Sequence, residues 1–175
     1  MSQFDASTCT DDVIRGVDLC GKQVVVTGAS SGLGVETARS LAAAGADVLL
    51  VARNTGKLET ALATLRSAVP GASFDSVLLD LADLASVRSG ADAILARCPR
   101  IDVLVNNAGV TGFEESTAPQ DPEHASLEDW RAVHRVNLDG TFLGCRYAIK
   151  AMRRAGGKGS IINISSRSGL VGIPG

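Results

Sequence analysis

The stretch that decides the fold is Gln23-Val24-Val25-Val26-Thr27-Gly28-Ala29-Ser30-Ser31-Gly32-Leu33-Gly34. Its first five residues are a short, mostly β-branched run that predicts a buried strand, and a helix is predicted over residues 33–44. Between them Gly28 permits a tight turn, Gly32 leaves room for a pyrophosphate, and Gly34 lets the helix lie close to the strand. The free N–H groups of the helix start favour bound phosphate, although a glycine turn without a ligand is the alternative. The candidate phosphate-binding residues are Gly28, Ser30, Ser31, Gly32, Leu33 and Gly34.

Strand and helix patterns alternate through the rest of the chain. Short apolar runs predict further strands at 48–52, 76–79, 101–105 and 160–164. Helical patterns lie at 55–68, 83–98 and 127–155, and a polar segment at 112–126 predicts a mobile loop. This alternation requires parallel strands joined by right-handed crossovers. The sequence therefore predicts an α/β protein with a doubly wound parallel sheet in a three-layer αβα arrangement.

Composition excludes several classes of protein. The net charge is -2, so neither nucleic acid nor an anionic membrane is an expected partner. No apolar run reaches the roughly 20 residues that span a bilayer, and the N-terminus lacks the pattern of a signal peptide. The four cysteines are scattered and the chain has 2 histidines, so we expect reduced thiols, no metal site and a cytoplasmic location.

Three motifs follow the first, fourth and fifth predicted strands. They are the glycine run 27–34, Asn106-Asn107-Ala108-Gly109, and Asn163-Ile164-Ser165-Ser166. Their order and positions resemble the short-chain dehydrogenase/reductase family, and the resemblance covers residues 19–175. It implies a Rossmann fold and an NAD(P)-dependent oxidoreductase that acts on an alcohol or ketone, as a homo-oligomer (dimer or tetramer). Residues 19–175 are then the NAD(P)-binding domain, and residues 1–18 are predicted to be a flexible lead-in.

The end of the second strand bears on the choice between NAD and NADP. An acidic residue there would bind the ribose 2′-hydroxyl of NAD, but this chain has Ala52 followed by Arg53. A guanidinium pairs with a 2′-phosphate through charge-assisted hydrogen bonds. We therefore favour NADP over NAD, with a solvated surface position for Arg53 as the alternative. Ser31 stands where the family's other NADP signal, a basic residue in the glycine loop, would be.

Further candidate cofactor residues follow the third and fourth strands. In similar proteins an aspartate at the position of Asp80, which precedes Leu81, binds the adenine amino group; a turn cap is the structural alternative. The resemblance places three residues along the cofactor's far ribose, namely Asn107, Ala108 and Gly109. Asn106 is expected instead to brace the sheet through side-chain bonds to backbone.

The resemblance also implies a catalytic serine, asparagine, tyrosine and lysine. Ser166 matches the serine that orients the substrate oxygen, and Asn137 matches a helical asparagine that anchors a proton-relay water. The structural alternatives are local backbone bonding for Ser166 and a surface or kink-forming role for Asn137. In the family the tyrosine exchanges a proton with the substrate oxygen, while the lysine holds the ribose and lowers the tyrosine pKa.

The Tyr-x-x-x-Lys pair has no match in this sequence. The one tyrosine, Tyr147, precedes Ser166, and the residue four positions after it is Ala151. We expect Tyr147 to be a packing or interface residue. From the resemblance, the last helix and strands are expected to be missing after Gly175. The fifth strand would then be a bare edge, and the isolated chain would be inactive.

Two alternatives come from other classes. One is a catalytically dead module that binds a dinucleotide or a partner, which the presence of Ser166 and Asn137 disfavours. The other is an α/β phosphate-binding protein of a different family, which the three joint motifs exclude. The substrate stays open, because surface loops set specificity on such folds.

Overall fold

The structure, a computed structural model, describes residues 4–5, 7–111 and 123–166. Within these residues five strands form one sheet in the order β3-β2-β1-β4-β5, and each neighbouring pair is parallel. The strands are β1 (Gln23–Thr27), β2 (Asp47–Ala52), β3 (Phe74–Leu78), β4 (Val103–Asn106) and β5 (Ser160–Asn163). The predicted doubly wound parallel sheet is confirmed.

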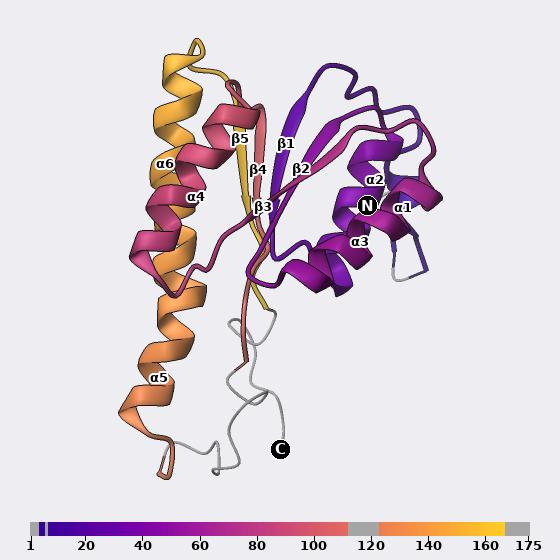
Figure 1. Ribbon diagram of the computed structural model, residues 1–175. Coiled ribbons are helices and arrows are strands. Elements are labelled where there is room, and N and C mark those ends of the chain that lie inside the picture. Colours follow the sequence, from indigo (N-terminus) through magenta and orange to yellow (C-terminus); the bar gives the residue numbers. More distant parts are fainter. Residues whose placement is uncertain (1–3, 6, 112–122, 167–175) are drawn as a thin grey trace.

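Helices cover both faces of this sheet, with α2 and α3 on one face and α4 and α6 on the other (Figure 1). A π-helical segment, η1 (Arg135–Asp139), joins the last two helices. The α-helices are α1 (Thr10–Val13), α2 (Gly32–Ala43), α3 (Thr55–Ala68), α4 (Leu84–Arg97), α5 (Leu127–His134) and α6 (Gly140–Arg154). In the described part of the chain, no helix has both the length and the apolar character that crossing a membrane requires.

The central strand β1 explains why there are three layers. Val24 and Val26 are fully buried in a core shared with α2 and α3, whereas Val25 belongs to a second core shared with α4 and α6. Successive side chains of a strand point to opposite faces, so a continuous apolar strand needs a helical layer on each side. The run of valines therefore specifies the double covering of the sheet.

The strand order places a crevice beside β1. The chain runs outward from β1 to β2 and β3, then returns to β4 on the other side of β1. The connections that leave β1 and β4 diverge at this reversal, and open α/β sheets bind ligands at the strand ends there. The glycine loop and the segment after β4 thus lie on either side of one crevice.

β4, predicted at 101–105, comprises Val103–Asn106, and two further differences from the sequence prediction have a clear cause. β3 begins at Phe74 rather than Ser76, because Phe74 pairs with Val48 and is buried although a polar residue follows it. The predicted continuous helix 127–155 changes its hydrogen-bond pattern at η1, so that α5 and α6 are separate elements. The predicted loop at 112–126 lies mostly outside the described residues.

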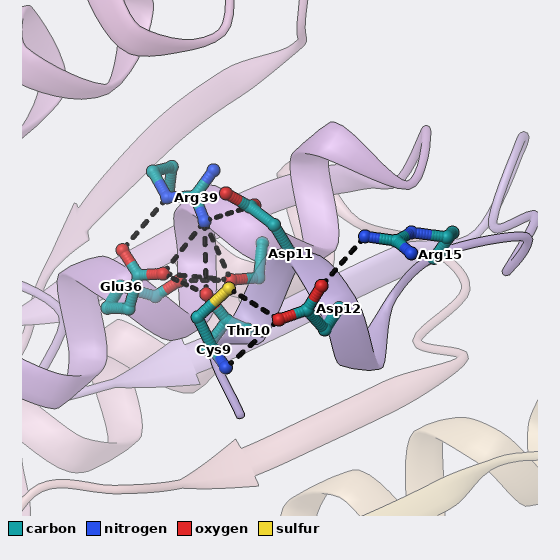
Figure 2. A network of polar contacts seen from close by, with 8 residues as sticks. Cys9, Thr10, Asp11, Asp12, Arg15, Glu36 and Arg39 are labelled. Carbon is teal, nitrogen blue, oxygen red and sulfur yellow. Dashed lines mark hydrogen bonds and ion pairs between the residues drawn. The ribbon is translucent and has the colours of Figure 1, made fainter. Parts of the chain in front are cut away.

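The predicted lead-in contains a helix that contacts the domain (Figure 2). Arg39 of α2 donates to Asp11 at 2.6 Å and to Glu36 at 2.8 Å, and the Thr10 hydroxyl donates to Glu36. Hydrogen bonds from Arg39 and Thr10 lower the pKa of Glu36 to about 2. The carboxylates of Glu36 and Asp11 in turn raise the pKa of Arg39. Residues 10–13 are thus tied to α2, while the division of the chain at residue 18 stays a prediction.

Candidate active site

A cleft of about 570 Å³ opens at the carboxyl ends of β1, β2 and β4. Its walls come from the loops after β1, β2, β3 and β4, which are far apart in sequence. Most of the predicted cofactor residues line it, namely Gly28, Ser30, Ser31, Arg53, Asp80, Leu81, Asn107, Ala108 and Gly109. The other three, Gly32, Leu33 and Gly34, form the first turn of α2 and are not among the lining residues.

The glycine loop is held by close backbone contacts. Gly28 has a φ of 66°, and a Cβ added there would stand 2.7 Å from the Ala108 Cα. A Cβ on Gly34 would stand 2.3 Å from the carbonyl oxygen of Gly28. Gly32, with a φ of 55°, has no atom within 4 Å of such a Cβ. Packing therefore requires Gly28 and Gly34, whereas Gly32 faces open space.

The start of α2 differs from the starts of α3, α4 and α5. Asn54, Asp83 and Ser126 each accept a hydrogen bond from the first turn of α3, α4 or α5. Ser31 holds the same position in α2, but its side chain caps nothing. The first N–H groups of a helix carry its positive dipole end and need acceptors. The uncapped start of α2 therefore fits an anionic group such as a phosphate.

Thr27 ties the two sides of the cleft together. Its buried hydroxyl accepts hydrogen bonds from the backbone N–H groups of Asn107 and Ala108, both at 3.1 Å. In return the Asn107 side chain donates to the carbonyl oxygens of Thr27 at 3.1 Å and Gly28 at 3.3 Å. These bonds hold the segment after β4 against the glycine loop, so the two cleft walls keep a defined separation.

Two polar residues at the strand ends have structural partners. The Asp80 carboxylate accepts a hydrogen bond from the Ala82 N–H at 2.9 Å, which is the turn cap that is the structural alternative to adenine binding. The prediction that the Asn106 side chain bonds to backbone is wrong. Its amide donates a hydrogen bond to the Asn163 side chain at 2.8 Å. Gly144 allows this arrangement, since a Cβ there would lie 2.4 Å from the Asn106 Oδ1.

The candidate catalytic residues lie outside the cleft lining. Asn137 is in η1, where its amide donates to the Val110 carbonyl and accepts from the Val110 N–H, each at 2.8 Å. π-Helical segments of this kind recur at functional sites. Ser166 is exposed just beyond β5. Tyr147 is a residue of α6 that packs against the core on the α4 side and lines a separate groove, so it has no place at the cleft.

The profile of one protein family, described as short chain dehydrogenase, matches residues 22–175. The chain belongs to the short-chain dehydrogenase family. The match includes the glycine loop, the cleft and both candidate catalytic residues.

Relatives in this family include enzymes that act on alcohols. The D-threitol dehydrogenase of Mycolicibacterium smegmatis is 41% identical over 158 residues, which are 89% of this chain and 56% of that enzyme. The cyclopentanol dehydrogenase of a Comamonas species is 37% identical over 88% of this chain and 58% of that enzyme. The chain thus spans a little over half the length of these relatives.

Solved structures of the family superpose on most of the chain. A metagenomic short-chain oxidoreductase in complex with NADP has a TM-score of 0.77 and 38% identity, covering 89% of this chain and 66% of that one. A short-chain dehydrogenase/reductase from Mycobacterium marinum has a TM-score of 0.79 and 31% identity, covering 90% of this chain and 59% of that one. These likenesses agree with the sheet topology.

The cleft also contains residues that the sequence patterns do not indicate. Thr27, Asn54 and Lys57 are polar, and Val110 and Val136 are apolar. Thr27 directly precedes the glycine loop, so its position was a usable signal. Val136 comes from the distant η1 segment, and no local pattern could have assigned it to the cleft.

Proposed function

We propose that the chain forms the cofactor-binding part of an NADP-dependent oxidoreductase that interconverts an alcohol and a ketone by hydride transfer. The observation that carries this proposal is the cleft itself. The glycine loop, the segment after β4 and a basic residue after β2, Arg53, all line this one cleft. The likeness to threitol and cyclopentanol dehydrogenases supports a small secondary alcohol as substrate.

The cleft offers complementary groups along the length of a dinucleotide. The uncapped start of α2, with Ser30 and Ser31, suits the pyrophosphate. At one end Arg53, Asp80 and Leu81 would contact the adenosine part. At the other end Asn107, Ala108 and Gly109 would contact the nicotinamide ribose. When bound, the nicotinamide supplies or accepts the hydride.

The preference for NADP rests on charge. The residue that ends β2 is Ala52, so no carboxylate stands where it would repel a 2′-phosphate. Arg53 follows and lines the cleft, where its guanidinium can form charge-assisted hydrogen bonds with a dianionic group. Asp80 is the one carboxylate among the described lining residues. The NADP-bound relative is consistent with this preference.

Ser166 and Asn137 would act at the reacting end. Ser166 would orient the substrate oxygen from its place after β5. Asn137 would contribute by holding the Val110 backbone with both atoms of its amide, which fixes the cleft wall after β4. Tyr147, in its groove between α4 and α6, is not placed to exchange a proton there. We therefore propose that residues 1–175 alone bind cofactor without turnover. Separately, from the family resemblance, we propose that the active protein is a homo-oligomer.

Calorimetric titration with NADP⁺ and NAD⁺ tests the cofactor assignment. We expect NADP⁺ to bind at least about tenfold more tightly, and Arg53→Gln to remove most of that advantage. Arg97→Gln, which changes an exposed arginine outside the cleft, is the matched control. Equal binding of both cofactors would contradict the NADP preference, and no binding of either would contradict the proposed function.

Turnover is tested separately with cyclopentanol and threitol as probe alcohols. Residues 1–175 should give no cofactor reduction, while a product extended by a Tyr-x-x-x-Lys helix should give it and lose it on Ser166→Ala. If the extended product bound cofactor but never turned over, the alternative of a catalytically dead binding module would replace the proposal.

A further inference from the structure

Lys57 lies at the same end of the cleft as Arg53. Both residues line the cleft, together with Asn54 between them in sequence. Asn54 caps α3 by accepting a hydrogen bond from the Lys57 backbone N–H at 2.9 Å. This bond holds the Lys57 backbone at the third position of α3, in the first turn of the helix that follows β2.

A lysine at this position opposes the electrostatics of its own helix. The first turn of a helix is its positive end, which favours acidic residues and disfavours cations. At the third position a glutamate would complete a capping box. Among the described α-helices, α3 is alone in carrying a basic residue within its first three positions. Local rules are most often broken at functional sites, because a ligand compensates for the cost.

In the described part of the chain, Lys57 has no charged partner. The cleft's described lining includes one carboxylate, Asp80, and that side chain already accepts a hydrogen bond from the Ala82 N–H. The helix end, Lys57 and Arg53 therefore add three sources of positive potential at one place. An anion with two negative charges is the ligand chemistry that suits them.

We infer that Lys57 is a second cation for the 2′-phosphate of NADP and, beside Arg53, determines the specificity for NADP over NAD. This inference rests on the proposed function. The two side chains have different tasks there. The planar guanidinium of Arg53 can bind two phosphate oxygens in a fixed geometry. The ammonium of Lys57 is a compact charge on a flexible stem, which neutralises the remaining negative charge without demanding one geometry.

Calorimetry with 2′,5′-ADP and 5′-AMP tests the role of Lys57. These two probes differ by the 2′-phosphate alone and need only the adenosine end of the cleft. We expect Lys57→Gln to weaken 2′,5′-ADP binding about tenfold and to leave 5′-AMP within about twofold. Lys57→Arg should retain most of the affinity for 2′,5′-ADP. Lys150→Gln, an exposed helical lysine outside this cleft, should change neither affinity.

Lys57→Glu separates a binding defect from a folding defect. An acidic side chain in the first turn of α3 should raise the melting temperature by about 2 °C, while lowering 2′,5′-ADP affinity further than Lys57→Gln does. Opposite signs in the two measurements would support the inference. A fall in both would overturn it, because Lys57 would then be a structural residue.

The outcomes also separate this inference from the proposed function. If Arg53→Gln removes the preference for 2′,5′-ADP and Lys57→Gln does not, the Lys57 inference fails while the NADP assignment stands. If Lys57→Gln weakens both probes equally, Lys57 contacts a group that they share, and the inference fails again. If the unaltered protein binds neither probe, the proposed dinucleotide site itself is wrong.

Discussion

β1 and β5 are both short aliphatic strands, yet their burial is opposite. Val24 and Val26 of β1 are 0% exposed, whereas Ile162 of β5 is 45% exposed and Ile164 just after it is 50% exposed. β1 has a strand on each side and a helical layer on each face. In the described residues β5 pairs with β4 alone, and Ile161 packs toward α6 while Ile162 points to the other face.

This difference shows that the stability a strand contributes depends more on the strands and helices around it than on its amino-acid composition. Burial of apolar area stabilises a fold in proportion to the area removed from water. The half of the sheet around β1 and β2, which carries the glycine loop, is therefore expected to supply most of the stability. The β5 end contributes less in the described part of the chain. Substitutions at the two ends of the sheet test this difference, and two weaker contacts of the well-packed half can be tested beside them.

The largest effect should come from paired truncations in β2 and β5. Leu50→Ala removes a side chain that is 0% exposed, and we expect it to cost about 3 kcal/mol of unfolding free energy. Ile162→Ala should cost less than about 1 kcal/mol, because its side chain is already partly in water. Urea denaturation of both variants measures the two values. Equal losses would show that β5 is as well packed as the centre of the sheet.

Paired glycine substitutions probe backbone packing at the same two ends. Gly34→Ala places a Cβ 2.3 Å from a backbone oxygen, so the loop must shift, and we expect a loss of about 2 kcal/mol. Gly159→Ala, just before β5, meets the Sδ of Met152 at 2.5 Å, but that flexible side chain can move. Its cost should stay below about 1 kcal/mol. Thermal melts of both variants give the comparison, and a reversed order would contradict it.

A smaller effect is expected at the link between η1 and the cleft wall. Asn137→Ala removes two exposed hydrogen bonds to Val110, each 2.8 Å long, and should cost about 1 kcal/mol. Hydrogen exchange should speed up at the Val110 amide, while the amides of β1 stay protected. Unchanged exchange at Val110 would mean that this wall is held by other contacts.

The smallest effect concerns the contact of α1 with α2. Because the folded-state pKa of Glu36 is lowered to about 2, its charged form stabilises the fold above the usual pKa of 4.5. That stabilisation should be lost as the pH falls from about 4.5 through 2. Glu36→Gln should remove this part of the pH dependence, and the partial exposure of the pair keeps its contribution small. Melting temperatures between pH 2 and 7 test it, and identical profiles of the two proteins would refute it.

Much of the fold could be predicted from sequence because it depends on local patterns. The continuous apolar runs of β1 and β2 and the glycines beside them specify buried strands and a turn without reference to distant residues. The sequence pattern predicts too late a start for β3, because Phe74 is followed by the exposed Asp75 and the local pattern is weak there. The η1 segment was missed because its hydrogen-bond shift accompanies a contact to Val110, 27 residues away.

Some residues of the candidate site can likewise be predicted from local sequence patterns, and others cannot. Gly28 and Arg53 could be singled out because each directly follows a recognisable strand, and Gly34 because it belongs to the same glycine run as Gly28. The order of elements, the double winding of the sheet and the glycine loop therefore follow from local sequence patterns. The bonds by which Thr27 ties the two cleft walls together, and the presence of Lys57 in one cleft with Arg53, follow from the folded structure alone. The folded structure also decides that β5 is half exposed while β1 is buried. These properties depend on which distant segments become neighbours, and local periodicity does not carry that information.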